Sequence, residues 1–256
     1  MFNLFGSKKL VVDAYTYKHS IFYTYNPKIA REYAPSYLKD MPAIIENPYN
    51  GVPMSTLRGC VGLRKLYSQG IILPLWTDVI VNIPESPKEG TNNPPGTPGV
   101  IVADLTTRIQ SHPTEQWSNF VDPRLFVHTK LESPWLFYCK EEIDWIFAGC
   151  SWNQKDPLEA EILPGCLDFK YQHQTNVNIL IKRNTTNSRL FMEAGTPIVH
   201  LIPVTERDIE LKIHLVSEDE YMHMSASNAP TSFTNNYNKS RKIRQDNEKS
   251  KCPFHF

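Results

Sequence analysis

A run of alternating apolar residues between positions 73 and 83 constrains the fold more than any other feature of the sequence. Every second position is leucine, threonine, valine or isoleucine, and five of the six side chains are aliphatic: Leu73, Leu75, Thr77, Val79, Val81 and Ile83. A period of two puts such side chains on one face of a β-strand. A strand with one apolar face must bury it against another layer, so we expect a mainly β protein.

Prolines separate the other apolar segments, as is typical of extended connections between strands, and they outnumber glycines 20 to 11. Two short helices are expected at 27–39 and 55–69, the second with its start signal at Ser55 or Thr56. The segment 84–99 holds five prolines and three glycines and is expected to be an exposed loop. Further strands are expected at 10–17, 100–108, 124–131, 135–140, 144–148, 167–172, 177–183, 197–204 and 209–216.

These elements divide the chain into three parts. Residues 1–69 are expected to form an N-terminal strand and helical segment packed on the core, and 70–217 a β-rich core domain. Residues 218–256 contain few aliphatic side chains, so we expect a polar, partly basic tail or arm. Within it, 239–251 is the one stretch whose excess of basic residues could contact nucleic acid.

The composition excludes several classes of protein. The 27 basic side chains equal the 27 acidic ones, so no global field attracts nucleic acid or an anionic membrane. The longest apolar stretch, 71–76, has six residues, against ~18 or more for a transmembrane helix. Residues 1–6 lack the features of a signal peptide, so we expect an intracellular protein with no membrane partner. Five scattered cysteines without a C-x-x-C pair favour reduced thiols, and no bound metal is expected.

Residues 163–204 carry two motifs, separated by a strand and a polar turn. The first reads Leu-Pro-Gly-Cys-Leu-Asp-Phe-Lys-Tyr, and the second reads Glu-Ala-Gly-Thr-Pro-Ile-Val-His-Leu. This order resembles the dUTPase and dCTP deaminase superfamily, which has a Gly-x-Ile-Asp-x-x-Tyr turn and a Gly-x-x-Ile-x-Gln-Leu strand. The matching residues are Gly165, Asp168, Tyr171, Gly195, Ile198 and Leu201, with His200 in place of the family's glutamine.

The resemblance implies a fold and an assembly. It implies a distorted β-barrel of the β-clip (dUTPase-like) type, here with short N-terminal helices and an extended C-terminal tail, and a homotrimer with sites between subunits. The many short strands with proline-rich turns suit a jelly-roll sandwich equally well, so that architecture stays open as the alternative.

The resemblance also implies a site. In a dUTPase the aspartate of the first motif activates the attacking water, and the tyrosine packs under the deoxyribose. Asp168 is therefore the candidate catalytic residue, and Tyr171, Ser151, Gly165 and His200 are the candidate ligand-binding residues. No cofactor is expected, except that a bound nucleotide would bring Mg2+.

The arginine-bearing phosphate motif of the superfamily is missing. The corresponding segment, 149–153, reads Gly-Cys-Ser-Trp-Asn. Phosphoryl transfer depends on charge neutralisation, so this loss favours a non-catalytic protein that binds a nucleotide, another small anion or a partner protein. One alternative is a virion structural or interaction protein, with contacts made by 84–99 and the basic tail. A second alternative is a divergent nucleotide pyrophosphatase or deaminase.

Short motifs along the whole chain are similar to those of a family of proteins from large tailed phages. They include Tyr-Leu-Lys-Asp-Met-Pro at 37–42, Ser-Pro-Trp at 133–135 and Glu-Ala-Gly-Thr-Pro at 193–197. The resemblance implies a location in the host cytoplasm or the virion, and a phage or host protein as a partner.

Overall fold

The computed structural model describes residues 8–35, 38, 40–83, 99–102, 107, 109–112, 121–122, 124–150, 152, 160–183, 189–226, 242 and 245–246. In chain order the elements, with η for a 3-10 helix, are β1 Leu10–Thr16, α1 His19–Thr24, β2 Lys28–Ile29, η1 Ala30–Tyr33, β3 Ile44–Glu46, β4 Pro53–Ser55, η2 Leu57–Gly59, α3 Val61–Ser68, β5 Ile71–Pro74, β6 Val79–Asn82, β7 Gly99–Val102, β8 Ile109–His112, β9 Phe126–Leu131, β10 Leu136–Cys139, β11 Asp144–Gly149, β12 Ala160–Ile162, β13 Gly165–Asp168, β14 Val177–Lys182, β15 Arg189–Met192, β16 Pro197–Pro203, β17 Ile209–Leu215 and α4 Glu218–Ala226.

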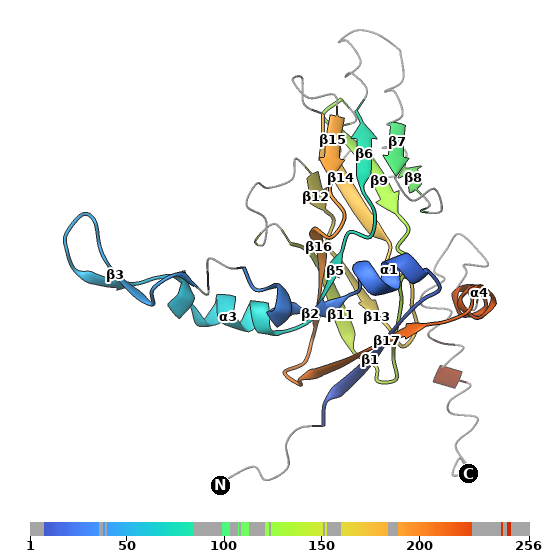
Figure 1. The fold of residues 1–256 in the computed structure, drawn as a ribbon, viewed down its shortest axis with the longest axis horizontal. Coiled ribbons are helices and arrows are strands. Elements are labelled where there is room, and N and C mark those ends of the chain that lie inside the picture. Colours follow the sequence, from blue (N-terminus) through green and yellow to red (C-terminus); the bar gives the residue numbers. More distant parts are fainter. Residues whose placement is uncertain are drawn as a thin grey trace.

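The prediction of a mainly β protein is confirmed (Figure 1). The strand orders of the sheets are β10-β1-β17, β13-β11-β16-β5-β2, β12-β14-β9-β8, β15-β6-β7 and β3-β4. The first and last strands of the body, β1 and β17, pair in parallel, and the other described pairs are antiparallel. Among the described strands the sheets do not close into a barrel, so the β-clip and jelly-roll architectures stay predictions.

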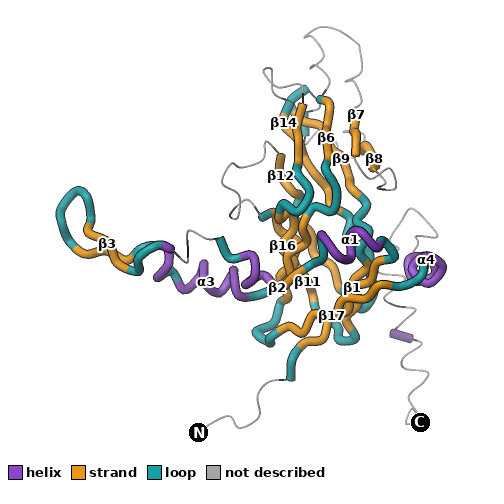
Figure 2. Tube along the Cα trace, viewed as in Figure 1, coloured by secondary structure: helices purple, strands orange, loops and turns teal. Residues whose placement is uncertain are grey.

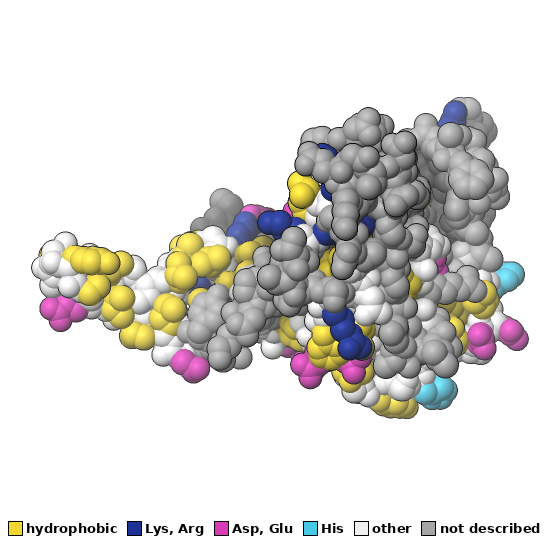
Figure 3. Space-filling model, turned by 90° about the horizontal axis from the view of Figure 1, so that it is seen from above, with side chains coloured by type: hydrophobic (Ala, Val, Ile, Leu, Met, Phe, Trp, Pro, Cys, Tyr) yellow, Lys and Arg dark blue, Asp and Glu magenta, His cyan; other side chains and the backbone are white. Residues whose placement is uncertain are grey.

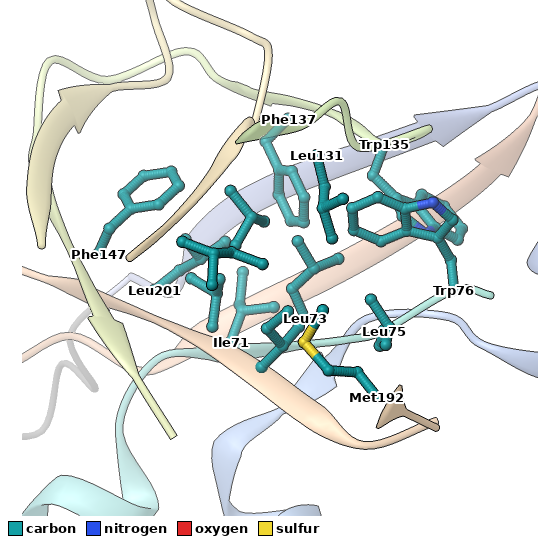
Figure 4. Packing of buried hydrophobic residues seen from close by; sticks show 14 of the residues in the cluster. Ile71, Leu73, Leu75, Trp76, Leu131, Trp135, Phe137, Phe147, Met192 and Leu201 are labelled. Carbon is teal, nitrogen blue, oxygen red and sulfur yellow. The ribbon is translucent and has the colours of Figure 1, made fainter. Parts of the chain in front are cut away.

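The main hydrophobic core lies between these sheets (Figure 4). It receives aliphatic side chains from β1, β5, β6, β14 and β16 and aromatic ones from β10, β11 and the segments between strands. Trp135 and Trp145 have no exposed surface at all. Burial of such large side chains stabilises the fold by about 1.5–3 kcal/mol each, so this core is what holds the sheets together.

The alternating run 73–83 is buried as predicted, but it does not form one strand. Its aliphatic positions from 73 to 81, in β5, just after it and in β6, have exposed fractions of 1% or less: Leu73, Leu75, Val79 and Val81. β5 ends at Pro74, which has no N–H to continue the ladder, and the Asp78 carboxylate accepts a hydrogen bond from the Ala194 N–H at 2.8 Å. The two halves therefore join different sheets, β5 beside β16 and β6 beside β15.

The N-terminal segment departs from its predicted helices. The strand at 10–17 is confirmed as β1, but 27–35 forms β2 and η1 where a helix was predicted. The Ala30 N–H donates to the Gly70 carbonyl at 3.0 Å, which ties this segment to β5 and replaces an intrahelical bond. The second predicted helix is confirmed only over Val61–Ser68, because the Thr56 hydroxyl bonds to the Pro42 carbonyl at 2.6 Å and does not cap a helix.

Two described helices, α1 and α4, were not predicted. α4 begins the segment 218–256, where a tail was expected, and the Ser217 hydroxyl accepts a hydrogen bond from the Glu220 N–H at 3.2 Å as an N-cap. None of the described helices is long and apolar enough to span a membrane. The predicted loop 84–99 (apart from Gly99) and most of the basic segment 239–251 lie outside the described residues.

A hairpin formed by β3 and β4 projects far from the sheets and is joined to them through α3 (Figures 1 and 2). Its turn reads Asn-Pro-Tyr-Asn-Gly. The side chain of Asn47 accepts a hydrogen bond from the Tyr49 N–H at 2.9 Å, and that of Asn50 accepts one from the Val52 N–H at 3.0 Å. Gly51 has a φ of 70°, which glycine adopts without strain. We call residues 44–61 the arm.

Candidate functional site

Asp168 ends β13 and holds a turn together. Its side chain is 1% exposed, and one carboxylate oxygen accepts a hydrogen bond from the Lys170 N–H at 2.8 Å. The Ile143 N–H also donates to it. Burial raises the pKa of this carboxyl and the nearby Glu142 and Asp144 raise it further, whereas the two backbone donors lower it. The carboxylate is thus occupied by backbone groups, which is the geometry of a turn-capping residue.

Tyr171 is also buried, and its hydroxyl group is tied to a neighbouring carboxylate. It donates to Oε2 of Glu142 at 2.8 Å, and the side chain of Gln245 donates to Oε1 of the same carboxylate at 3.4 Å. Burial raises the pKa of the Tyr171 hydroxyl, and the Glu142 acceptor raises it further. These bonds connect the turn after β13 to the C-terminal segment, so Tyr171 has a packing role in the described chain.

His200 lies in β16 with no exposed surface. Its Nε2 is 2.7 Å from the Gln69 carbonyl, which can only accept, so Nε2 carries the proton. Burial lowers the pKa of the imidazole, and the hydrogen bond to Gln69 only partly offsets this. Nδ1 has no hydrogen-bond partner among the described residues. The Trp152 ring packs edge-on against the imidazole, with 5.5 Å between the two ring centroids. His200 is therefore a neutral, buried packing residue.

The predicted site residues do not converge within one subunit. Asp168 pairs with Asp144 on one side of β11, whereas His200 pairs with Ala148 on the other side. The four residue steps from Asp144 to Ala148 span about 13 Å along β11, and two strand spacings separate β13 from β16 across the sheet. Gly165 begins β13 with open space where a Cβ would lie, and Ser151 is outside the described residues.

The described residues contain no group of three or more histidine, cysteine or acidic side chains that could hold a metal ion. A cavity of about 140 Å³ beside α4 is lined by Tyr17, Glu132 and Tyr221 among others, and it is too small for a nucleotide. Asp168 and His200 line neither this cavity nor a larger groove between η1 and α3.

The arm presents an apolar surface that sequence reasoning missed (Figure 3). Among the described residues, seven of the thirteen exposed large hydrophobic side chains lie on it: Ile44, Ile45, Tyr49, Val52, Met54, Leu57 and Val61. Scattered exposed hydrophobic residues are normal, but a contiguous group marks an interaction site. The signal for the hairpin was present, since a turn sequence lies between two short apolar runs.

A groove of about 900 Å³ lies at the base of the arm, between η1 and α3. Basic side chains line it from both elements, and Figure 3 shows Lys and Arg side chains where the arm meets the body. Its described lining contains no aspartate or glutamate, and the basic members are Arg31, Arg58, Arg64 and Lys65. Arg58, Arg64 and Lys65 are close together in the chain, but Arg31 precedes them by more than 25 residues and joins them only through the contact of α3 with η1, so sequence reasoning missed the group.

Comparisons with protein-family models, with curated proteins and with solved structures found no match to this chain. The candidate site is therefore defined by its geometry: a projecting apolar arm with a basic groove at its base.

Proposed function

We propose that the protein is a non-catalytic assembly subunit, and that its arm binds a second copy of the same chain. The observation that carries the proposal is the exposure of the arm's apolar side chains, such as Ile44 at 63%, Tyr49 at 95% and Val61 at 76%. Leaving such side chains in water forgoes about 25 cal/mol for each Å² of apolar surface. Covering them on a partner is the gain that would drive assembly.

The size of the arm suits a stable interface. It contains 18 residues, 44–61, and both strands of its hairpin are exposed along their whole length. A standard protein interface uses about 20–30 residues on each side. The arm and its immediate surroundings are thus enough for one half of such an interface.

A second copy is the favoured partner because the body carries a matching exposed surface. Cys166 and Ile146 are cross-strand neighbours on β13 and β11, and both are exposed, as is Val204 at the end of β16. Among the described strands β13 lies at the edge of its sheet, and an edge strand can pair with a strand of another chain. An arm on one subunit and a receiving face on the next form a heterologous contact, which closes into a ring when the rotation allows it.

The geometry around Asp168 supports a role without catalysis. A general base must reach a proton on its substrate or on a water, whereas the described contacts of this carboxylate are backbone N–H groups. The resemblances to the β-clip superfamily and to proteins of large tailed phages add that the assembly would be a homotrimer in the host cytoplasm or the virion. The β-clip barrel itself is part of this proposal.

The mass in solution tests the proposal. We expect light scattering at micromolar concentration to give a multiple of the 29.5 kDa chain mass. The double variant Ile44→Ser/Val52→Ser should become monomeric with an unchanged circular dichroism spectrum. A matched control, Leu125→Ser/Phe191→Ser, removes two hydrophobic side chains of similar exposure outside the arm and should remain oligomeric. A monomeric wild-type protein, or an arm variant that keeps the wild-type mass, would overturn self-assembly through the arm.

A further inference from the structure

The groove at the base of the arm has the charge of an anion site. Arg31 in η1 and Arg64 in α3 line it, and neither forms an ion pair with another described residue. Lys65 pairs with Glu206 at 2.7 Å, so its charge is already partly offset and the anion site depends on the arginines. Gathering cations in one groove without carboxylates in its lining is unfavourable until an anion joins them.

Arg58 adds a fixed donor to the same groove. Its Nη1 donates to the Met41 carbonyl at 3.0 Å, which holds the guanidinium in place without cancelling its charge. A guanidinium offers five N–H donors in a planar fork that fits two oxygens of a phosphate group at once. Three arginines around one groove therefore match phosphate better than a single carboxylate or chloride.

Apart from Gly59 and Ser68, the remaining lining of the groove is apolar. Leu38 and Tyr67 are buried and line it, together with Ala34 and Ala43. Its volume of about 900 Å³ falls within the usual range of ~300–1,000 Å³ for small-molecule sites. A ligand that suits both parts has a phosphate or pyrophosphate group and an apolar ring system, which is the chemistry of a nucleotide.

We propose that this groove binds a phosphate-bearing nucleotide between η1 and α3, with Arg31, Arg58 and Arg64 on its phosphates. The site is separate from Asp168 and Tyr171, which do not line the groove. Arg58, Gly59 and Val61 belong both to the arm and to the lining of the groove, whereas Arg31 and Arg64 lie outside the arm, so variants at these two arginines test the groove separately from self-assembly.

Calorimetric titration with ATP and with pyrophosphate, each with and without Mg2+, tests the site. We expect both probes to bind the full-length protein, more weakly as the salt concentration rises, because screening weakens ion contacts at an exposed groove. The double variant Arg31→Gln/Arg64→Gln should bind at least tenfold more weakly. Both side chains are exposed, so the variant should fold, and circular dichroism will check this.

The control variant Arg189→Gln/Lys212→Gln removes the same charge from exposed positions on β15 and β17 and should bind as the wild type does. Absence of binding by either probe at about 10 mM, or equal affinities in the groove and control variants, would overturn the proposal. Tighter binding of a single-stranded oligonucleotide than of ATP, lost in the groove variant, would also overturn it in favour of a nucleic-acid surface.

Discussion

Replacing Gly70 by alanine should destabilise the protein strongly, because the chain passes from α3 into β5 at this glycine with almost no space. Gly70 has a φ of 91°, which side chains other than glycine rarely adopt. A Cβ built there would lie 2.3 Å from the Leu201 carbonyl oxygen and 2.8 Å from Nε2 of His200. The first of these distances is about 1 Å short of van der Waals contact, and the oxygen belongs to a central strand that cannot move freely.

The backbone conformation of Gly70 and the close contact of a Cβ there together determine the expected loss of stability. A left-handed backbone costs a residue with a Cβ about 1–2 kcal/mol, and overpacking of a well-packed interior costs about 1–3 kcal/mol. Gly70→Ala should therefore lower the free energy of unfolding by about 2–5 kcal/mol. With a urea m-value of ~2–3 kcal/mol/M for a chain of this size, the unfolding midpoint should fall by about 1–2 M.

The matched control is Gly165→Ala at the start of β13. No atom lies within 4 Å of the position that a Cβ would take there, and the φ of this residue is not in the left-handed region. Urea unfolding followed by tryptophan fluorescence should show this variant within about 0.5 kcal/mol of the wild type. If the two variants unfolded at the same midpoint, the close packing of Gly70 against β16 would be refuted.

Three further outcomes are expected. The pKa of His200 is lower in the folded chain than in the unfolded one, so the neutral imidazole stabilises the fold above about pH 6.5, and this stabilisation is lost as the pH falls through the folded pKa. In urea unfolding at different pH values, His200→Gln should weaken the dependence of stability on pH, and an unchanged dependence would contradict burial of a neutral His200. Asp168→Asn keeps a hydrogen-bond acceptor for the turn and should change the urea unfolding midpoint little at neutral pH, whereas Asp168→Ala should lower the free energy of unfolding by about 1–3 kcal/mol. Equal losses of stability in the two variants would argue against a capping role for Asp168. In the monomeric variant Ile44→Ser/Val52→Ser, a maleimide should modify the exposed Cys60 and Cys166 but not the buried Cys150, whose pKa is raised by burial, and peptide mapping after a short pulse would reveal any equal labelling.

The sequence predicted what is buried better than how the strands pair. The alternating positions from Leu73 to Val81 all face the core, because a period of two reports burial on one side of an extended chain. It does not report the hydrogen-bonding partner, and so the change of sheet between Pro74 and Asp78 could not be predicted. The partners that fix this change, Ala194 and Thr196, lie more than a hundred residues away.

The arm and the groove at its base were not predicted from the sequence, for a related reason. Motif matching selected Asp168 and Tyr171, whose spacing serves a structural turn as well as it serves a catalytic one. The hairpin of the arm buries neither face, so it has no alternation of apolar and polar residues to detect. Leu57 and Val61 lie within the predicted helix 55–69, in a segment expected to pack on the core, but both side chains are exposed.

The way in which the arm is held together explains how its apolar side chains can serve a partner. An isolated two-stranded hairpin is only marginally stable in water. Here the base of the hairpin is fastened by polar bonds: the Thr56 N–H donates to the Ala43 carbonyl at 3.0 Å, and Arg58 donates to the Met41 carbonyl at 3.0 Å. The turn is fixed by its own asparagine side chains. Because the described bonds that hold the arm come from backbone and polar groups, its apolar side chains contribute little to its own fold, and serine substitutions there should separate assembly from folding.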